Sequence, residues 1–98
     1  MYLRMVIGEM IHDDQLREFR NIFKEEYVPT LREEVGFQRG DLAIEEGGRM
    51  AVILTDWDTR DHCLRYHAAR SYRQFVGKIQ HLLIGDFVVK IFRCESPG

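Results

Sequence analysis

Apolar positions in the first part of the chain follow two spacings, one typical of a strand and one of a helix. Residues 2–11 are apolar and β-branched enough to predict a strand. A helix should follow, because Asp13 or Asp14 can cap it and an apolar stripe then recurs at helical spacing. That stripe consists of Leu16, Phe19, Ile22, Phe23 and Tyr27. Pro29 predicts a kink or break, and Gly36 ends the helix.

The middle of the chain has the pattern of a β-hairpin. Residues 36–58 contain two apolar runs of strand length, separated by Gly47 and Gly48. A Gly-Gly pair tolerates positive φ at both central positions of a tight turn. This is the strongest local signal in the sequence, and it predicts two antiparallel strands joined at that pair.

A second helix and a last strand complete the pattern. Asp58 or Thr59 can cap the helix. Its later half carries an apolar stripe that we assign to the core: Tyr72, Phe75, Val76, Ile79, Leu82 and Leu83. Ser71 marks an irregularity between two helical segments. Residues 84–94 predict the last strand, and residues 95–98 a frayed end.

The predicted order is β-α-β-β-α-β in a single domain spanning residues 1–98. This is the order of the ferredoxin-like α+β fold, in which both helices pack on one face of a four-stranded antiparallel sheet. The other face of such a sheet meets water, so its strands should alternate between apolar and polar residues.

These strands carry apolar residues on both faces. The first strand has Leu3, Met5, Ile7 and Ile11 on one face and Tyr2, Val6 and Met10 on the other. The third has Met50, Val52 and Leu54 on one face and Ala51, Ile53 and Trp57 on the other. The last has Phe87, Val89 and Ile91 on one face and Val88 and Phe92 on the other. Leaving one such face open would forgo about 1.5–3 kcal/mol for each large side chain. We therefore predict a homodimer in which two sheets pack face to face and form a dimeric α+β barrel.

Charge and composition exclude several partners. The chain has 14 basic and 16 acidic residues, a balance that disfavours binding to nucleic acid or to an anionic membrane. No apolar run approaches the roughly 20 residues that span a bilayer, and Arg4 and Glu9 interrupt the N-terminal apolar segment. We therefore expect a cytoplasmic protein. Cys63 and Cys94 have no paired spacing, which favours reduced, structural thiols.

The segment from Trp57 to Phe75 concentrates the side chains that could do chemistry. His67 is the main catalytic candidate, because a neutral imidazole in a dry pocket can hydrogen-bond a phenol or take its proton near pH 7. The alternative is a half-buried structural histidine. Trp57, Tyr66 and Tyr72 are candidates for the pocket wall, with anchoring of the core or of an interface as the alternative.

Arg4 and His62 are two further pocket candidates. An unpaired guanidinium in an apolar strand is costly, so we favour an ion pair of Arg4 with Glu9, Asp56 or a carboxylate of a second copy. The alternative is that Arg4 binds an anionic substrate. His62 shares a helix face with Tyr66, but no three metal ligands converge, and we predict no metal site. The common hydrolase, dinucleotide and zinc-protease motifs are missing from the sequence.

Three stretches together resemble the antibiotic biosynthesis monooxygenase family, of the dimeric α+β barrel superfamily. They are "VPTLREEVGFQRGDL", an aliphatic strand ending in "TDWD", and "RYHAARSYRQFVGKI". The resemblance runs roughly from Met1 to Arg93 and is specific for fold rather than for reaction. It implies a dimer with a small-molecule pocket in each subunit, between the helices and the sheet.

The resemblance also implies a set of activities. The first is cofactor-independent oxidation of phenolic molecules or isomerisation of a small carbonyl metabolite, and we expect no cofactor. A non-catalytic module that binds a small metabolite, or that serves only in assembly, is the alternative from another class. Haem degradation is a minor alternative, because the positions of the Trp and the axial His in the haem-degrading relatives correspond here to Tyr66 and Val76.

Overall fold

The computed structural model describes residues 1–10 and 12–95. In chain order the elements are β1 (Tyr2–Glu9), α1 (Asp13–Ile22), the π-helix η1 (Phe23–Tyr27), α2 (Val28–Leu31), β2 (Phe37–Ile44), β3 (Met50–Trp57), α3 (Arg60–Tyr66), α4 (Arg70–Ile79), the 3₁₀ helix η2 (Gln80–Leu82) and β4 (Val88–Arg93). Ile11, expected to end the first strand, and the last three residues of the expected frayed end lie outside the described residues.

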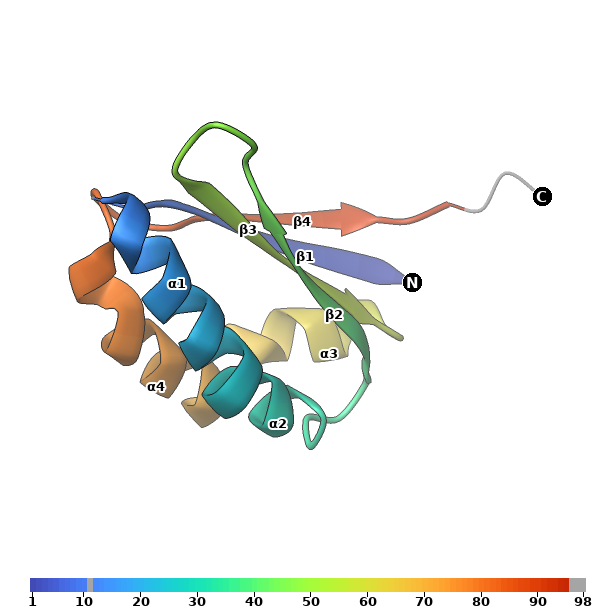
Figure 1. The fold of residues 1–98 in the computed structure, drawn as a ribbon. Coiled ribbons are helices and arrows are strands. Elements are labelled where there is room, and N and C mark those ends of the chain that lie inside the picture. Colours follow the sequence, from blue (N-terminus) through green and yellow to red (C-terminus); the bar gives the residue numbers. More distant parts are fainter. Residues whose placement is uncertain (11, 96–98) are drawn as a thin grey trace.

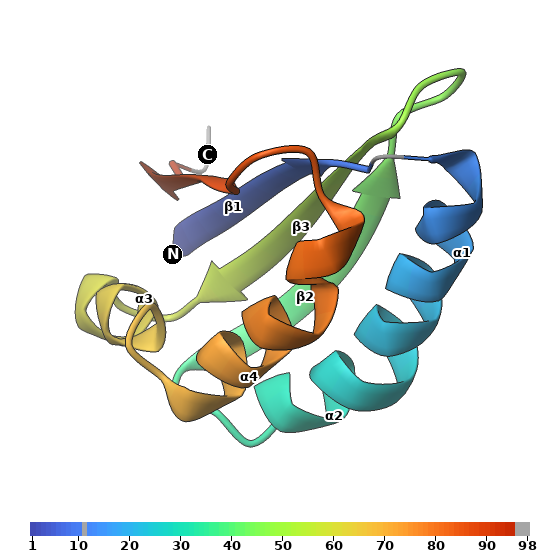
Figure 2. The same ribbon diagram turned by 90° about the vertical axis from the view of Figure 1, so that its left-hand side faces the viewer.

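The strands form one antiparallel sheet in the order β2-β3-β1-β4. The helices gather on one side of this sheet, as Figures 1 and 2 show from two directions. The predicted ferredoxin-like α+β fold is thus confirmed. In the described part of the chain, no helix is long and apolar enough to cross a membrane.

The first helical segment differs from its prediction at both ends. Its N-cap is His12 in extended conformation, so neither Asp13 nor Asp14 caps it. The backbone N–H of His12 donates to the side chain of Gln15 (2.9 Å), and both aspartates lie in the first turn, where they complement the helix dipole. Around Pro29, where a kink or break was expected, the helix is irregular without ending: a π-helical turn precedes Pro29, which occupies the first turn of α2.

The β2–β3 hairpin has a longer connection than predicted. The strands are joined through residues 45–49, and the backbone N–H of Glu45 donates to the carbonyl of Met50 (2.9 Å). Of the two central glycines only Gly47 has a positive φ, of 73°. The prediction of two consecutive positive-φ glycines was therefore wrong, whereas the hairpin itself is present.

The two faces of the sheet have different environments. Arg4, Val6, Ile53 and Trp57 on the helix side are buried. The opposite face is also mainly apolar, as predicted, and has no helix over it (Figure 2). Its apolar side chains are Leu3, Met5 and Ile7 of β1, Met50, Val52 and Leu54 of β3, and Val88 and Phe92 of β4, and we call them the open face. Val88 and Phe92 are 50% and 43% exposed.

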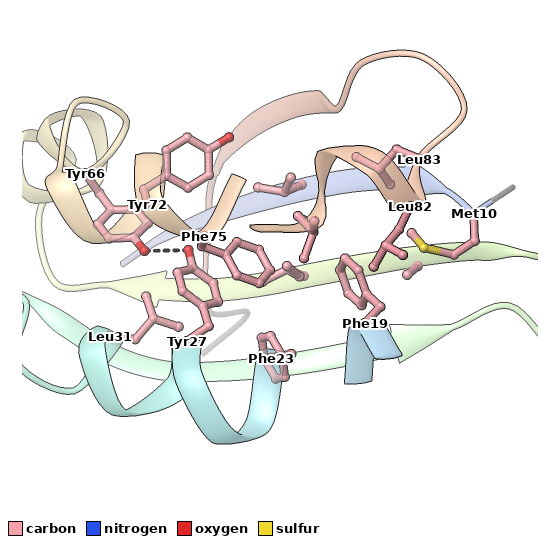
Figure 3. Close-up of a cluster of buried hydrophobic side chains, with 14 of the residues drawn as sticks. Met10, Phe19, Phe23, Tyr27, Leu31, Tyr66, Tyr72, Phe75, Leu82 and Leu83 are labelled. Atoms are coloured by element: carbon pink, nitrogen blue, oxygen red, sulfur yellow. Dashed lines mark hydrogen bonds between the residues drawn. The ribbon is translucent and has the colours of Figure 1, made fainter. Parts of the chain in front are cut away.

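Aromatic side chains from the helices fill the core on the other side (Figure 3). Tyr27 stacks on Phe75 with ring centroids 3.8 Å apart and an interplanar angle of 8°. Phe19 meets the same Phe75 edge to face at 6.0 Å. These contacts join α1 and η1 to α4, so the layer that positions the pocket is held by ring packing.

Candidate functional site

His67 owes its position to a break between α3 and α4. It is the C-cap of α3, and two residues later Ala69 is extended (φ −66°, ψ 142°) and starts α4. The irregularity expected at Ser71 thus exists but lies two to four residues earlier. The break turns the chain at His67, so its ring does not lie on the face of a continuous helix.

A pocket of about 470 Å³ lies between α4 and the segment that leads into β4. One part of its lining is hydrocarbon: Val76, Leu83, Phe87 and Val89. The other part is polar: His67, Tyr72, Arg73, Gln80 and Asp86. Most of the surface that these residues turn to the pocket is apolar, and a mainly apolar wall with several polar groups is the usual make-up of a site for a small organic molecule. We call it the α4 pocket.

Beneath this pocket, Arg4 of β1 contacts His67 and Tyr72. Its Nη2 lies 3.0 Å from Nδ1 of His67. Its guanidinium carbon is 4.1 Å from the centroid of the Tyr72 ring and 5.4 Å from that of Tyr66, within the range of cation–π attraction. The rings of His67 and Tyr72 are 5.5 Å apart. Arg4 itself is 1% exposed.

Arg4 forms no ion pair with Glu9 or Asp56, so those two pairings were wrong, whereas a pairing with a carboxylate of a second copy stays a prediction. Asp56 follows Thr55 in β3, and its side chain projects to the opposite face of the sheet. Within residues 1–10 and 12–95, Nε of Arg4 has no hydrogen-bond partner. In the described part of the single chain, the guanidinium is therefore buried among rings with no carboxylate bonded to it.

Trp57 and Tyr66 are placed away from the α4 pocket. Nε1 of Trp57 donates to Oγ1 of Thr55 (2.9 Å), and its ring lies 4.7 Å from that of Tyr66. The Tyr66 hydroxyl donates to the hydroxyl of Tyr27 (Figure 3). Burial raises the pKa of Tyr66 to about 12, and burial followed by the charge of Tyr66 raises the pKa of Tyr27 further. Both phenols are therefore neutral at physiological pH.

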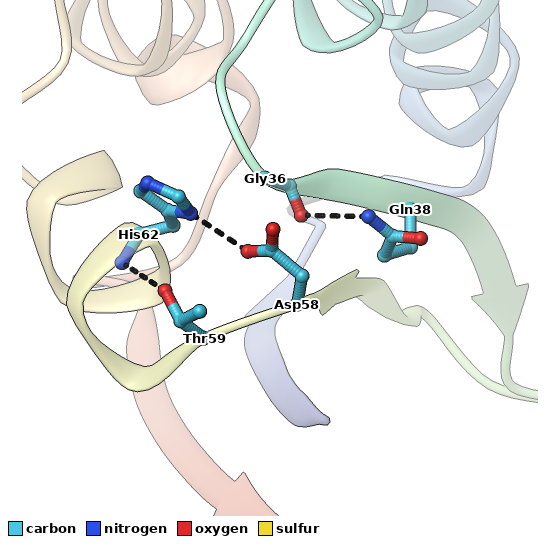
Figure 4. A network of polar contacts seen from close by, with 5 residues as sticks. All are labelled: Gly36, Gln38, Asp58, Thr59 and His62. Carbon is cyan, nitrogen blue, oxygen red and sulfur yellow. Dashed lines mark hydrogen bonds and ion pairs between the residues drawn. The ribbon is translucent and has the colours of Figure 1, made fainter.

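His62 belongs to a polar network at the start of α3 (Figure 4). Its Nδ1 lies 2.7 Å from Oδ1 of Asp58, and its backbone N–H donates to the Thr59 side chain, which caps α3 as expected. The hydrogen bond from His62 holds the pKa of the Asp58 carboxyl below its usual range. His62 also borders a second hollow of about 230 Å³ together with Trp57 and Tyr66.

The sequence-predicted candidates therefore divide into two groups. His67 and Tyr72 line the α4 pocket with Arg4 behind them, whereas Trp57, Tyr66 and His62 border the second hollow. His67 is also more exposed than expected, lying on the surface of the single chain rather than in a dry interior. These positions do not form one site.

The apolar wall of the α4 pocket was not identified from the sequence. Val76 and Leu83 share the helical spacing of the core residues, and Phe87 and Val89 share the pattern of the strand. The turn between them, with Gly85 at a φ of 71°, was the available signal. Val76 also faces the pocket without an atom that could ligate iron, so nothing there supports the haem alternative.

Neither thiol lies on the α4 pocket. Cys63 is buried, and burial raises the pKa of its thiol, which suits the structural role expected from the sequence. Cys94 is exposed beyond the end of β4. Among the described residues, no three histidine, cysteine or acidic side chains lie together as a metal site would require.

Comparison with known proteins identifies relatives of the whole fold. The model of the family described as antibiotic biosynthesis monooxygenase matches residues 3–78. No protein with a curated description matches the sequence. Rv0793 from Mycobacterium tuberculosis superposes with a TM-score of 0.76 and 17% identity, over 98% of this chain and 97% of that one.

Two further solved structures come from Streptomyces. The monooxygenase ActVA-Orf6 of Streptomyces coelicolor, solved in complex with nanaomycin D, has a TM-score of 0.84 and 12% identity, over 97% of this chain and 88% of that one. SnoaB of Streptomyces nogalater, a cofactor-independent oxygenase, has a TM-score of 0.76 and 18% identity, over 97% of this chain and 94% of that one. At these identities the likeness establishes the fold and leaves the reaction to the residues of this chain.

Proposed function

Because the chain belongs to the antibiotic biosynthesis monooxygenase family, we propose that it is a cofactor-independent monooxygenase acting on a small, electron-rich aromatic molecule. The α4 pocket is the observation that carries this proposal, since it combines a hydrocarbon wall with His67 and Tyr72. ActVA-Orf6 with its bound nanaomycin D and the oxygenase SnoaB, both of the same fold, support the choice of substrate class and reaction. The same groups would also serve the isomerisation of a small carbonyl compound.

The reaction with dioxygen requires that the bound substrate is electron-rich and present as its anion. Dioxygen reacts slowly with neutral closed-shell molecules, whereas a phenolate or enolate can give it an electron. An anthrone illustrates the balance: its methylene carbon loses two hydrogens and gains one oxygen atom, and the second oxygen atom leaves as water. The substrate is oxidised and dioxygen is reduced. The residues of this chain need only bind the ring and stabilise the anion's oxygen.

Within the pocket the roles follow from side-chain type. Val76, Phe87 and Val89 contact the faces of the ring, because their hydrocarbon surface gains free energy when it leaves water. His67 hydrogen-bonds the substrate oxygen, and Tyr72 forms the wall beside it. A hydrogen bond to a developing anion is stronger than one to a neutral oxygen, so it lowers the barrier to ionisation.

Oxygen uptake with 1,8-dihydroxyanthrone tests the proposal. The metal-free protein should consume oxygen and form the anthraquinone, faster than the substrate oxidises alone. His67→Ala should lower that rate about 100-fold to 1000-fold, the range seen when one donor to an oxyanion is removed. His81→Ala is the matched control, because His81 is exposed on η2 and does not line the pocket. Equal rates for His67→Ala and the unaltered protein would contradict the proposal.

A second function is favoured by the exposure of His67. Its ring lies on the surface of the single chain, where water can reach it, and catalysis through an anion gains most from a dry site. A non-catalytic module that binds a small metabolite needs no such exclusion of water. Binding of 1-naphthol to the α4 pocket, together with no oxygen uptake above the uncatalysed rate, would support the module instead.

The open face supports a homodimer. Eight apolar side chains of β1, β3 and β4 point to the side of the sheet that the helices leave free. A second copy packed sheet to sheet would cover them, and an interface of about 800 Å² per partner is typical of a stable complex. A dimer would also add surface near β4, one border of the α4 pocket.

A further inference from the structure

The contact between Arg4 and His67 determines where the imidazole carries its proton. A guanidinium has only N–H donors and stays protonated in proteins, so Nη2 of Arg4 is the donor of the 3.0 Å contact. Nδ1 of His67 must then be the acceptor and carries no proton. The hydrogen of the neutral ring is therefore on Nε2.

Arg4 also brings to this place a positive charge that has no acidic partner among the described residues of the single chain. It is 1% exposed, its Nε has no hydrogen-bond partner among the described residues, and the rings of Tyr66 and Tyr72 surround it. A buried cation interacts more strongly with nearby charges than an exposed one, because less water screens it. The missing counter-charge makes this end of the pocket favourable for an anion.

The other charged groups of the pocket do not cancel that preference. Arg73 on α4 and Asp86 on the segment before β4 are the charged residues in its lining, and both are exposed. They carry opposite charges and are screened by water and salt. Tyr72 is the remaining titratable side chain at this end, and its ring packs against both Arg4 and His67.

We propose that the α4 pocket selects the ionised oxygen of a phenol or enol, with the Nε2–H of His67 as its donor and Arg4 as the positioning residue that fixes this tautomer. The inference rests on the proposed function and deepens it, because His67 then stabilises an anion and does not remove its proton. Nε2 already carries a hydrogen and Nδ1 is bonded to Arg4. The neutral ring therefore has no free basic nitrogen to offer the substrate.

Nitrogen-15 NMR of the imidazole tests the tautomer without any substrate. In the unaltered protein at neutral pH, His67 should show a protonated Nε2 and an unprotonated Nδ1, as a single tautomer. Arg4→Met removes the donor, and His67 should then show a mixture of the two neutral tautomers. A protonated Nδ1 in the unaltered protein, or the same tautomer population in Arg4→Met, would overturn the inference.

Binding of 4-nitrophenol tests the selection of an anion, because its ionised form has a visible absorption band. We expect the anion to bind about tenfold more tightly than the neutral phenol, which lowers the pKa of the bound dye by about one unit. His67→Gln keeps an amide N–H donor near the position of Nε2 but has no basic nitrogen, so it should retain most of this preference. His67→Ala should lose it.

The outcomes separate this inference from the proposed function. If His67→Gln behaves like His67→Ala, or if the neutral dye binds as tightly as the anion, the donor role is overturned. A protein that prefers the nitrophenolate and shows the single tautomer, yet consumes no oxygen with the anthrone, would keep the donor role and lose the oxygenase. Oxygen uptake without any preference for the anion would keep the oxygenase and overturn the donor role of His67.

Discussion

Arg4 is a residue that stability alone does not explain. A guanidinium that is buried without a carboxylate costs free energy of solvation, and two aromatic rings and one imidazole nitrogen return only part of it. Proteins keep such groups mainly where they serve binding or catalysis. Its contact with His67 indicates that Arg4 serves the α4 pocket, which His67 lines.

Replacing Arg4 by an apolar side chain of similar length should therefore not destabilise the fold. We expect Arg4→Met to leave the free energy of unfolding unchanged or to raise it by about 1–4 kcal/mol, because a buried uncompensated charge is removed. Urea unfolding at pH 7 measures this. Arg17→Met, an exposed change on α1, is the control and should stay within about 0.5 kcal/mol. A loss of more than about 1 kcal/mol in Arg4→Met would contradict the interpretation.

The Tyr66 and Tyr27 pair predicts how stability changes in alkali. An unfolded tyrosine ionises near pH 10, whereas burial raises the pKa of folded Tyr66 to about 12. Between these values the unfolded state releases a proton that the folded state keeps. Each buried tyrosine should therefore lower the free energy of unfolding by about 1.4 kcal/mol per pH unit in that window.

Tyr66→Phe isolates this contribution. Its stability should fall less steeply above pH 10, although at pH 8 it should already be about 1–3 kcal/mol less stable, because the Tyr27 hydroxyl loses its partner. Urea unfolding at pH 8, 10 and 11 gives both values. Equal slopes in the two proteins would show that Tyr66 ionises alike in the folded and unfolded states.

Among the elements, the sequence predicted the order but not the details of the junctions between them. The alternation and the helical stripes arise from burial, which the residue pattern records directly. The break between α3 and α4 was expected at Ser71 but lies at Ala69, where no pattern marks it because Ala68 and Ala69 are good helix formers. The site depends on that break, because it places His67 beside Arg4.

The α4 pocket was missed for a related reason. Val76 and Val89 have the same side chains and the same spacing as core residues, and only the path of the chain around residues 83–87 leaves them beside a cavity. A pocket of this kind is a gap in packing between elements distant in sequence. By contrast His67, Tyr72 and Arg4 could be predicted as candidates, because polar or charged groups interrupt an apolar pattern there.

The connection between α2 and β2 gives a test of backbone conformation. Gly36 has a φ of 85°, and a Cβ atom there would overlap with the His62 ring and the Asp58 carboxylate seen beside it in Figure 4. Gly36→Ala should therefore cost at least about 1–2 kcal/mol. The matched control is Gly77→Ala inside α4, where a Cβ meets nothing within 4 Å.

Gly77→Ala should instead stabilise the protein by about 0.5–1 kcal/mol, because alanine has the higher helix propensity. Thermal unfolding of the two variants and of the unaltered protein should show stability changes of opposite sign, a loss for Gly36→Ala and a gain for Gly77→Ala. If Gly36→Ala is as stable as the unaltered protein, the positive φ and the close contact with Asp58 and His62 would be refuted.

For the whole molecule, the open face is the feature that a single chain leaves unexplained. Leu54→Lys places a charge at its centre, on β3, and should convert the expected dimer into single chains at micromolar concentration. Leu64→Lys is the matched control, because Leu64 is 39% exposed on α3, on the helix side of the sheet. Sedimentation velocity distinguishes the two masses.

Two results would contradict a dimer that forms through the open face. A single-chain mass for the unaltered protein would refute the homodimer, and an unchanged dimer in Leu54→Lys would place the interface elsewhere. Covering the open face also bears on the α4 pocket, since β4 contributes to both. Stability of the fold and access to the pocket are therefore expected to change together with the dimer.

We expect the α4 pocket to bind a small aromatic molecule beside His67. Proton–nitrogen correlation spectra of the labelled protein, titrated with 1-naphthol under argon, test it most directly. We predict that the largest shifts occur at His67, Val76 and Val89, which line that pocket. Shifts confined to Trp57 and His62 at the second hollow, or no saturable shifts at all, would contradict binding in the α4 pocket.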